Sequence, residues 1–139
     1  MALHFFSEAV DFKVPNPRKT ISWIKKTITT EGFRIGNINY IFCTDDYLFS
    51  MNKKFLNHTT LTDIITFDTS EEDGLVEGEV YISVERVTEN AKKLNIPFAI
   101  ELRRVMIHGV LHLVGYSDKT KRQKEAMRRK EDACLSLWH

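Results

Sequence analysis

Hydrophobic and polar positions along the chain follow the spacing of helices in some segments and of strands in others. Five segments repeat apolar residues every three to four positions and predict helices: residues 17–30, 45–56, 84–94, 97–114 and 119–137. Four short runs rich in β-branched and aromatic residues predict strands: residues 3–12, 39–44, 63–68 and 78–83. The acidic stretch 70–77 predicts an exposed loop. Strands and helices mix irregularly, so we expect an α+β fold with a small mixed four-stranded sheet packed with about five helices.

The length and composition of the chain predict that residues 1–139 form a single domain. A hydrophobic share of 42% and a charged share of 28% are ordinary for a soluble globular chain of this length. The formal net charge of +1 gives no overall field for nucleic acid or a membrane, so a charged partner must meet a local patch. No stretch is long enough to span a bilayer, and the first residues lack the pattern of a signal peptide. Cys43 and Cys134 have no ligand-like spacing, which favours reduced thiols and a cytoplasmic location.

The candidate chemistry lies in residues 108–118, which read HGVLHLVGYSD. His108 and His112 stand four apart, one helical turn on the same face, so both imidazoles can bind one metal ion. Gly115 can take the left-handed conformation that ends a helix, and the turn would bring Asp118 toward the same point. Two nitrogen ligands, one oxygen ligand and an open fourth position describe a catalytic zinc site. We therefore predict one Zn²⁺ per chain.

A histidine pair at this spacing can also arise by accident, with each ring packed separately. The flanking residues favour the metal, because they make the predicted helix apolar nearly all round and therefore buried. Buried imidazoles need polar partners, and one metal ion serves both. The apolar residues in question are Val105, Met106, Ile107, Val110, Leu111, Leu113 and Val114.

Three blocks of the sequence resemble the YbeY family of bacterial metallo-endoribonucleases. HGVLHLVGYSD is similar to the family's HGxLHLxGYDH signature. Residues 51–52 (MN) with 61–67 (LTDIITF) resemble its LN…PTDVLSF block, and residues 78–83 (GEVYIS) resemble its GDIxIS block. The blocks occur in the family's order with similar spacing.

This resemblance implies a zinc-dependent endoribonuclease whose metal-binding helix lines a cleft beside a small mixed sheet. It also implies action on single-stranded ribosomal RNA, in maturation of the 3′ end of the small-subunit RNA and in ribosome quality control. The implied partners are ribosomal RNA and the small ribosomal subunit, with no membrane and no DNA.

The chain departs from the family pattern at two positions. Asp118 stands where the family usually has a third histidine, which keeps a possible zinc ligand but could lower the metal affinity or favour a harder metal. Leu56 stands where the family often has an arginine that serves the RNA, so a phosphate contact is missing or supplied elsewhere.

Candidate groups for activating or positioning a nucleophile are Glu79 and Asp63. Each abuts a strand that resembles a family block. The alternative is structural: Asp63 ends a strand, and Glu79 is a solvated residue at a sheet edge. Analogy of fold does not assign either role.

Basic residues crowd the last predicted helix just after the metal motif. A cluster of this kind suits RNA phosphates, although acidic neighbours also fit a merely solvated helix face. The RNA-binding candidates are Lys119, Lys121, Arg122 and Lys124. Arg103 and Arg104 could join them if they face the same cleft.

Two other functions compete with the endoribonuclease. The spacing of His108, His112, Gly115 and Asp118 also matches a metallopeptidase, but such enzymes need a glutamate directly after the first histidine, where this chain has Gly109. The other alternative is a non-catalytic ribosome- or RNA-binding module in which zinc serves as a structural staple.

Overall fold

The computed structural model describes residues 3–56 and 62–138, and the side chains of all of these except residues 55 and 56. The position of Leu56, where the family often has an arginine, therefore lies outside the described side chains.

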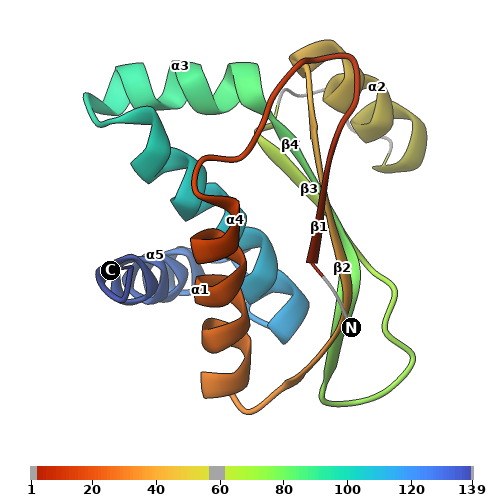
Figure 1. The fold of residues 1–139 in the computed structure, drawn as a ribbon, viewed down its shortest axis with the longest axis vertical. Coiled ribbons are helices and arrows are strands. Elements are labelled where there is room, and N and C mark those ends of the chain that lie inside the picture. Colours follow the sequence, from red (N-terminus) through yellow and green to blue (C-terminus); the bar gives the residue numbers. More distant parts are fainter. Residues whose placement is uncertain (1–2, 57–61, 139) are drawn as a thin grey trace.

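Within the described residues, four strands and five helices form one α+β unit, as predicted (Figure 1). Their order is β1 (Leu3–Ser7), α1 (Pro17–Thr30), β2 (Arg34–Cys43), α2 (Asp45–Leu56), β3 (Ile64–Asp68), β4 (Leu75–Ser83), α3 (Val84–Leu94), α4 (Phe98–Val114) and α5 (Lys121–Ser136).

The sheet is mixed, with the strand order β1-β2-β4-β3. Strand β2 pairs in parallel with both β1 and β4, whereas β3 pairs antiparallel to β4. The parallel pairs require long crossovers, and α1 and α2 begin those connections. Strands β3 and β4 lie beside α3 and α4, the helices that follow them in the chain.

The two faces of the sheet bury different helices, because side chains alternate along each strand. Val80 and Ile82 of β4 join Met106 and other residues of α4 in the larger core. Ile65 belongs to a smaller core on the other face, together with Leu48 of α2. Figure 1 shows α1, α4 and α5 together on one side of the sheet, with α2 apart from them.

Helix α4 lies directly against β3 and β4. A Cβ atom at Gly109 would be 2.8 Å from Val80 Cγ1 and 3.0 Å from Ile64 Cδ1, closer than side chains normally approach. Glycine at this position therefore lets the helix backbone approach the sheet. That contact fixes the part of α4 that carries His108 and His112.

Several strand boundaries differ from the predictions. Strand β1 ends at Ser7 instead of continuing to residue 12, because Ala9 takes a left-handed backbone conformation with φ 62° that turns the chain. Strand β2 begins at Arg34, five residues before the predicted start, because a register shift between Ile35 and Ile38 accommodates the turn-like residues there. Strand β4 begins at Leu75, so it takes the last residues of the predicted acidic loop.

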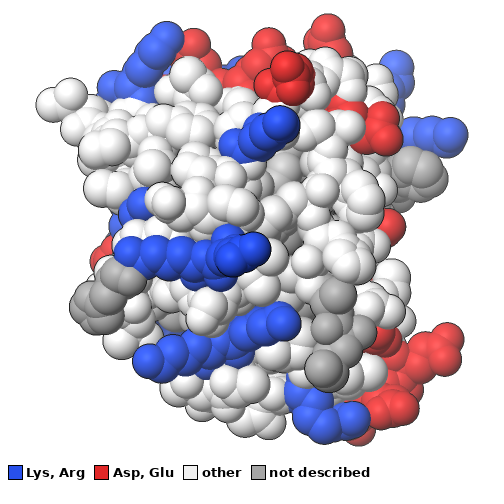
Figure 2. Space-filling model, in the orientation of Figure 1, with Lys and Arg blue, Asp and Glu red and all other residues white. Residues whose placement is uncertain are grey.

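Charged side chains on the face in Figure 2 are partly separated by sign. Basic side chains form bands across the middle and lower left, and acidic side chains gather at the upper edge and the lower right. No helix of the described chain is both long enough and apolar enough to cross a membrane. A charged partner must therefore be sought at a particular surface, as the small net charge predicts.

Candidate metal centre

The end of α4 and the turn that follows it bring three predicted ligands together. His108 and His112 lie one turn apart on α4, and Gly115, with φ 121°, ends the helix. The chain then doubles back to Asp118. The Nε2 atoms of His108 and His112 are 3.0 Å apart, and Asp118 Oδ2 lies 3.3 Å from the first and 3.4 Å from the second.

These separations fit a tetrahedral metal ion. Bonds of about 2.0–2.1 Å place neighbouring tetrahedral ligand atoms roughly 3.3–3.4 Å apart. The three side chains are 20%, 26% and 36% exposed, so a fourth position can open to solvent. In the described part of the chain, no other group of at least three His, Cys, Asp or Glu residues brings its ligand atoms this close.

Further contacts orient both imidazole rings. His112 Nδ1 donates to the carbonyl oxygen of Tyr116 at 3.1 Å, which fixes the proton of that ring on Nδ1. His108 Nδ1 lies 2.5 Å from Oε2 of Glu131 on α5. Each ring therefore turns its Nε2 atom toward the predicted ion, as in metal sites whose histidines are held by a carboxylate or carbonyl.

Glu131 is the functional residue that the sequence interpretation missed. It is 5% exposed, and its other oxygen accepts a hydrogen bond from Arg104 Nη1 at 3.1 Å. Burial lowers the pKa of His108, but the hydrogen bond and negative charge of Glu131 outweigh this and raise the pKa overall. A more basic imidazole is a stronger metal ligand. The available signal was the helical spacing of Met127, Glu131 and Cys134, which predicts a carboxylate on the same helix face as two apolar residues.

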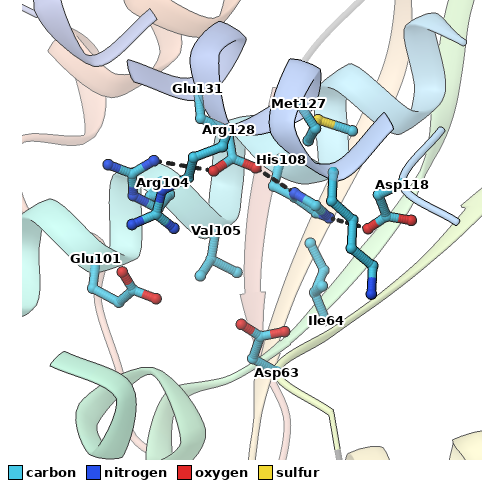
Figure 3. Close-up of a pocket in the computed structure, with 11 residues that line it drawn as sticks. Asp63, Ile64, Glu101, Arg104, Val105, His108, Asp118, Met127, Arg128 and Glu131 are labelled. Atoms are coloured by element: carbon cyan, nitrogen blue, oxygen red, sulfur yellow. Dashed lines mark hydrogen bonds and ion pairs between the residues drawn. The ribbon is translucent and has the colours of Figure 1, made fainter. Parts of the chain in front are cut away.

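A pocket of about 330 Å³ opens beside the metal ligands, between α4, α5 and the start of β3 (Figure 3). Its lining residues are Asp63, Ile64, Glu101, Arg104, Val105, His108, Asp118, Lys124, Met127, Arg128 and Glu131. The predicted metal ligands thus form one end of a cavity that also holds acidic, basic and apolar side chains.

The structure places the two candidate carboxylates differently. Asp63 points into the pocket, where Asn90 Nδ2 donates to its Oδ2 at 3.3 Å, and burial raises its pKa (Figure 3). Glu79 lies between Gly78 and Val80, which both face α4, so its side chain lies on the other face of the sheet. There Tyr81 Oη donates to Glu79 Oε1 at 3.5 Å. The structure therefore places Asp63 in the pocket that His108 and Asp118 also line, and it places Glu79 outside that pocket.

Only one of the four predicted RNA-binding residues lines the pocket. Lys124 lines the pocket, as does Arg128 one turn later on α5. Lys119, Lys121 and Arg122 are exposed and are not among the lining residues. The pocket can therefore meet a phosphate mainly through Lys124 and Arg128.

The Arg103 guanidinium and the two terminal nitrogens of Arg104 are engaged in other contacts. Arg104 pairs with Glu131 and with Asp132, at 3.1 Å and 2.7 Å. The Arg103 guanidinium lies over the Trp138 ring, 4.0 Å from its centre. Arg104 therefore holds Glu131, the carboxylate that contacts His108.

Comparison with known proteins defines the class of this protein. The family model described as "Endoribonuclease YbeY" matches residues 7–139. The chain belongs to this family of endoribonucleases, and it is therefore a hydrolase. The resemblance predicted from the sequence blocks is confirmed.

Relatives match over most of their length. A protein of Amoebophilus asiaticus named "Endoribonuclease YbeY" is 49% identical, over 96% of this chain and 90% of its own. One of the same name from Flavobacterium psychrophilum is 48% identical, over 96% of this chain and 95% of its own. The solution structure of TM1509 from Thermotoga maritima is similar with a TM-score of 0.64 and 28% identity, over 99% of this chain and 91% of that one.

Proposed function

We propose that this chain cuts single-stranded RNA with a zinc ion held by His108, His112 and Asp118. The observation that carries the proposal is the triangle of ligand atoms, with separations of 3.0–3.4 Å and a side open toward the pocket. When bound, zinc with an open position lowers the pKa of water and polarises a phosphoryl oxygen. Both effects favour hydrolysis of a phosphodiester.

The surrounding residues have separate tasks. Glu131 and the carbonyl of Tyr116 hold the two imidazoles in the ligand orientation. Asp63, fixed by Asn90, is the group that accepts a proton from the attacking hydroxyl or water. Its pKa, raised by burial, suits it to proton transfer better than that of a solvated carboxylate. Lys124 and Arg128 attract the RNA phosphates.

Family membership supports a proposal for the biological substrate. We propose that the RNA is ribosomal, that cleavage serves maturation of the 3′ end of the small-subunit RNA and ribosome quality control, and that the protein acts in the cytoplasm. The match to endoribonuclease YbeY over residues 7–139 supports these assignments.

The site geometry weighs against the two competing functions. A structural zinc staple normally has four protein ligands, whereas the described residues offer three. A metallopeptidase needs a carboxylate beside the first histidine, but Gly109 packs there against Val80 and Ile64. The arrangement therefore favours a catalytic centre without that peptidase base.

A cleavage assay on a single-stranded RNA, with and without a chelator, tests the proposal. We expect cleavage by the wild type, loss with chelator, and loss in His112→Ala. His4→Ala, which removes an exposed histidine on β1, is the matched control and should cleave normally. RNA binding without cleavage would support the non-catalytic module, and cleavage that survives both chelator and His112→Ala would contradict a metal-dependent reaction.

A further inference from the structure

The pocket extends beyond the proposed metal ligands to polar atoms that have no partner among the described residues. Glu101 is only 5% exposed, and its Oε1 atom is buried without a hydrogen bond to any described residue. Arg104, one turn further along α4, has a buried Nε atom in the same state. Leaving such groups unpaired is costly, so each calls for a binding partner. Figure 3 shows Glu101 on the side of the pocket away from Asp118.

The lining of this region disfavours a second metal ion. Of the described residues, only His108, His112 and Asp118 bring three ligand atoms within 4.8 Å of one another. The cationic side chains of Arg104 and Arg128 also line the pocket and would repel a cation. The chemistry instead suits a ligand that presents N–H donors to Glu101 and acceptor atoms to an arginine.

We propose that this region binds a guanine base of the RNA. Guanine presents a ring N–H and an amino group side by side, which one carboxylate can accept together, and its O6 and N7 atoms accept from arginine. Glu101 would take the donors, and the unpartnered Nε of Arg104 would take O6. Adenine and cytosine offer only an amino group on that edge, and uracil only a ring N–H, so each leaves Glu101 less well paired.

The remaining walls suit the faces of a base. Ile64, Val105 and Met127 give the pocket apolar surfaces from three different elements. Its volume of about 330 Å³ is in the range of small-ligand sites. Because His108 and Asp118 line the same cavity, a base seated at Glu101 would hold an adjoining phosphodiester near the metal centre. The inference rests on the proposed function and adds a preference for cleavage beside guanine.

Calorimetric titration of the zinc-loaded full chain with GMP, AMP, CMP and UMP tests the inference. All four carry the same phosphate, so differences in affinity report the base. We expect GMP to bind about 5- to 150-fold more tightly than the others. Inosine monophosphate, which lacks the amino group, should bind about tenfold more weakly than GMP. If the wild type bound all four nucleotides equally, or preferred another base, the proposal would be overturned without any variant.

Two variants test whether Glu101 causes the preference for guanine. Glu101→Gln should remove the advantage of GMP and leave the other three affinities nearly unchanged. Glu125→Gln, on an exposed position of α5 outside the pocket, should behave as the wild type. A guanine preference that persists in Glu101→Gln would contradict the role of this residue. The titration needs no cleavage, so selective GMP binding in a protein that fails to cut RNA would refute the proposed function and not this site.

Discussion

The Glu131 carboxylate lies 2.5 Å from Nδ1 of His108, although 23 residues separate them in the chain. Arg104 holds the same carboxylate from its other side. Helix α5 thus reaches the proposed metal centre through a side chain that is not one of the three proposed ligands. The contact decides which nitrogen of His108 faces the position of the proposed ion.

Replacing Glu131 should weaken metal binding. Glu131→Ala frees the His108 ring to rotate and lowers its basicity, so we expect zinc affinity to fall about 10- to 100-fold. Competition with a chromophoric chelator measures this affinity. Asp132→Ala is the matched control, because Asp132 also pairs with Arg104 but is exposed and does not contact His108. Unchanged affinity in Glu131→Ala would remove Glu131 from the metal centre.

Asp118 should be a direct ligand. Asp118→Ala removes the only oxygen of the triangle, so metal content should fall clearly below one ion per chain after dialysis. Asp118→His, which installs the residue usual in the family, should keep the ion. Metal analysis of the purified proteins gives the result, with Asp73→Ala in the exposed β3–β4 loop as control. Normal occupancy in Asp118→Ala would exclude Asp118 from the ligands.

Glu31 should make stability depend on pH. Its carboxylate pairs with Lys130 Nζ at 2.6 Å and accepts from Tyr116 Oη at 2.7 Å. These contacts, led by the Lys130 hydrogen bond, lower the pKa of Glu31 below 4.5. The stabilisation is therefore complete above pH 4.5 and is lost as the pH falls through the lowered pKa.

Glu31→Gln should accordingly lower the free energy of unfolding by about 1–3 kcal/mol at pH 7. The difference from the wild type should shrink as the pH falls below 4.5, the ordinary pKa of this carboxyl group. Urea unfolding at a series of pH values measures it. Glu71→Gln, in the exposed acidic loop, should show little effect at any pH. A difference that stays constant down to low pH would contradict the role of the charged carboxylate.

Lys124 and Arg128 should bind RNA phosphates. Each alanine substitution should weaken binding of single-stranded RNA and reduce the dependence of log affinity on log salt concentration by roughly 0.7. Fluorescence anisotropy at several salt concentrations measures both quantities. Lys92→Ala, near the end of α3 and away from the pocket, serves as control. If the variants showed the same salt dependence as the wild type, the phosphate contacts would have to be made by other residues.

Local sequence signals predicted the helices better than the strands. Helix α1 begins at Pro17 and α3 ends at Leu94, before Pro97, as expected, because proline acts locally on a helix start and on the residues that precede it. The start of β2 was missed because the irregular pairing between Ile35 and Ile38 depends on β4, which is distant in sequence. The end of a strand depends on pairing with neighbouring strands, which the strand's own sequence does not reveal.

The candidate site was likewise predicted only where the signal is local. The spacing of His108 and His112 and the turn at Gly115 are local, so the sequence predicted a cluster that the structure assembles. The contributions of Glu131 and Glu101 depend on how α5 and β3 pack against α4, which no local pattern specifies. For the same reason, the sequence could not tell which lysines of α5 face the pocket.

The most direct test is a titration of metal-free protein with zinc while cleavage of a single-stranded RNA is followed. The account predicts no cleavage without metal, a rise with added zinc, and a plateau at about one ion per chain. His112→Ala should stay inactive over the same range. Full cleavage by the metal-free protein, or a response to zinc that is equal in His112→Ala, would contradict the central claim that these ligands hold the ion that cuts RNA.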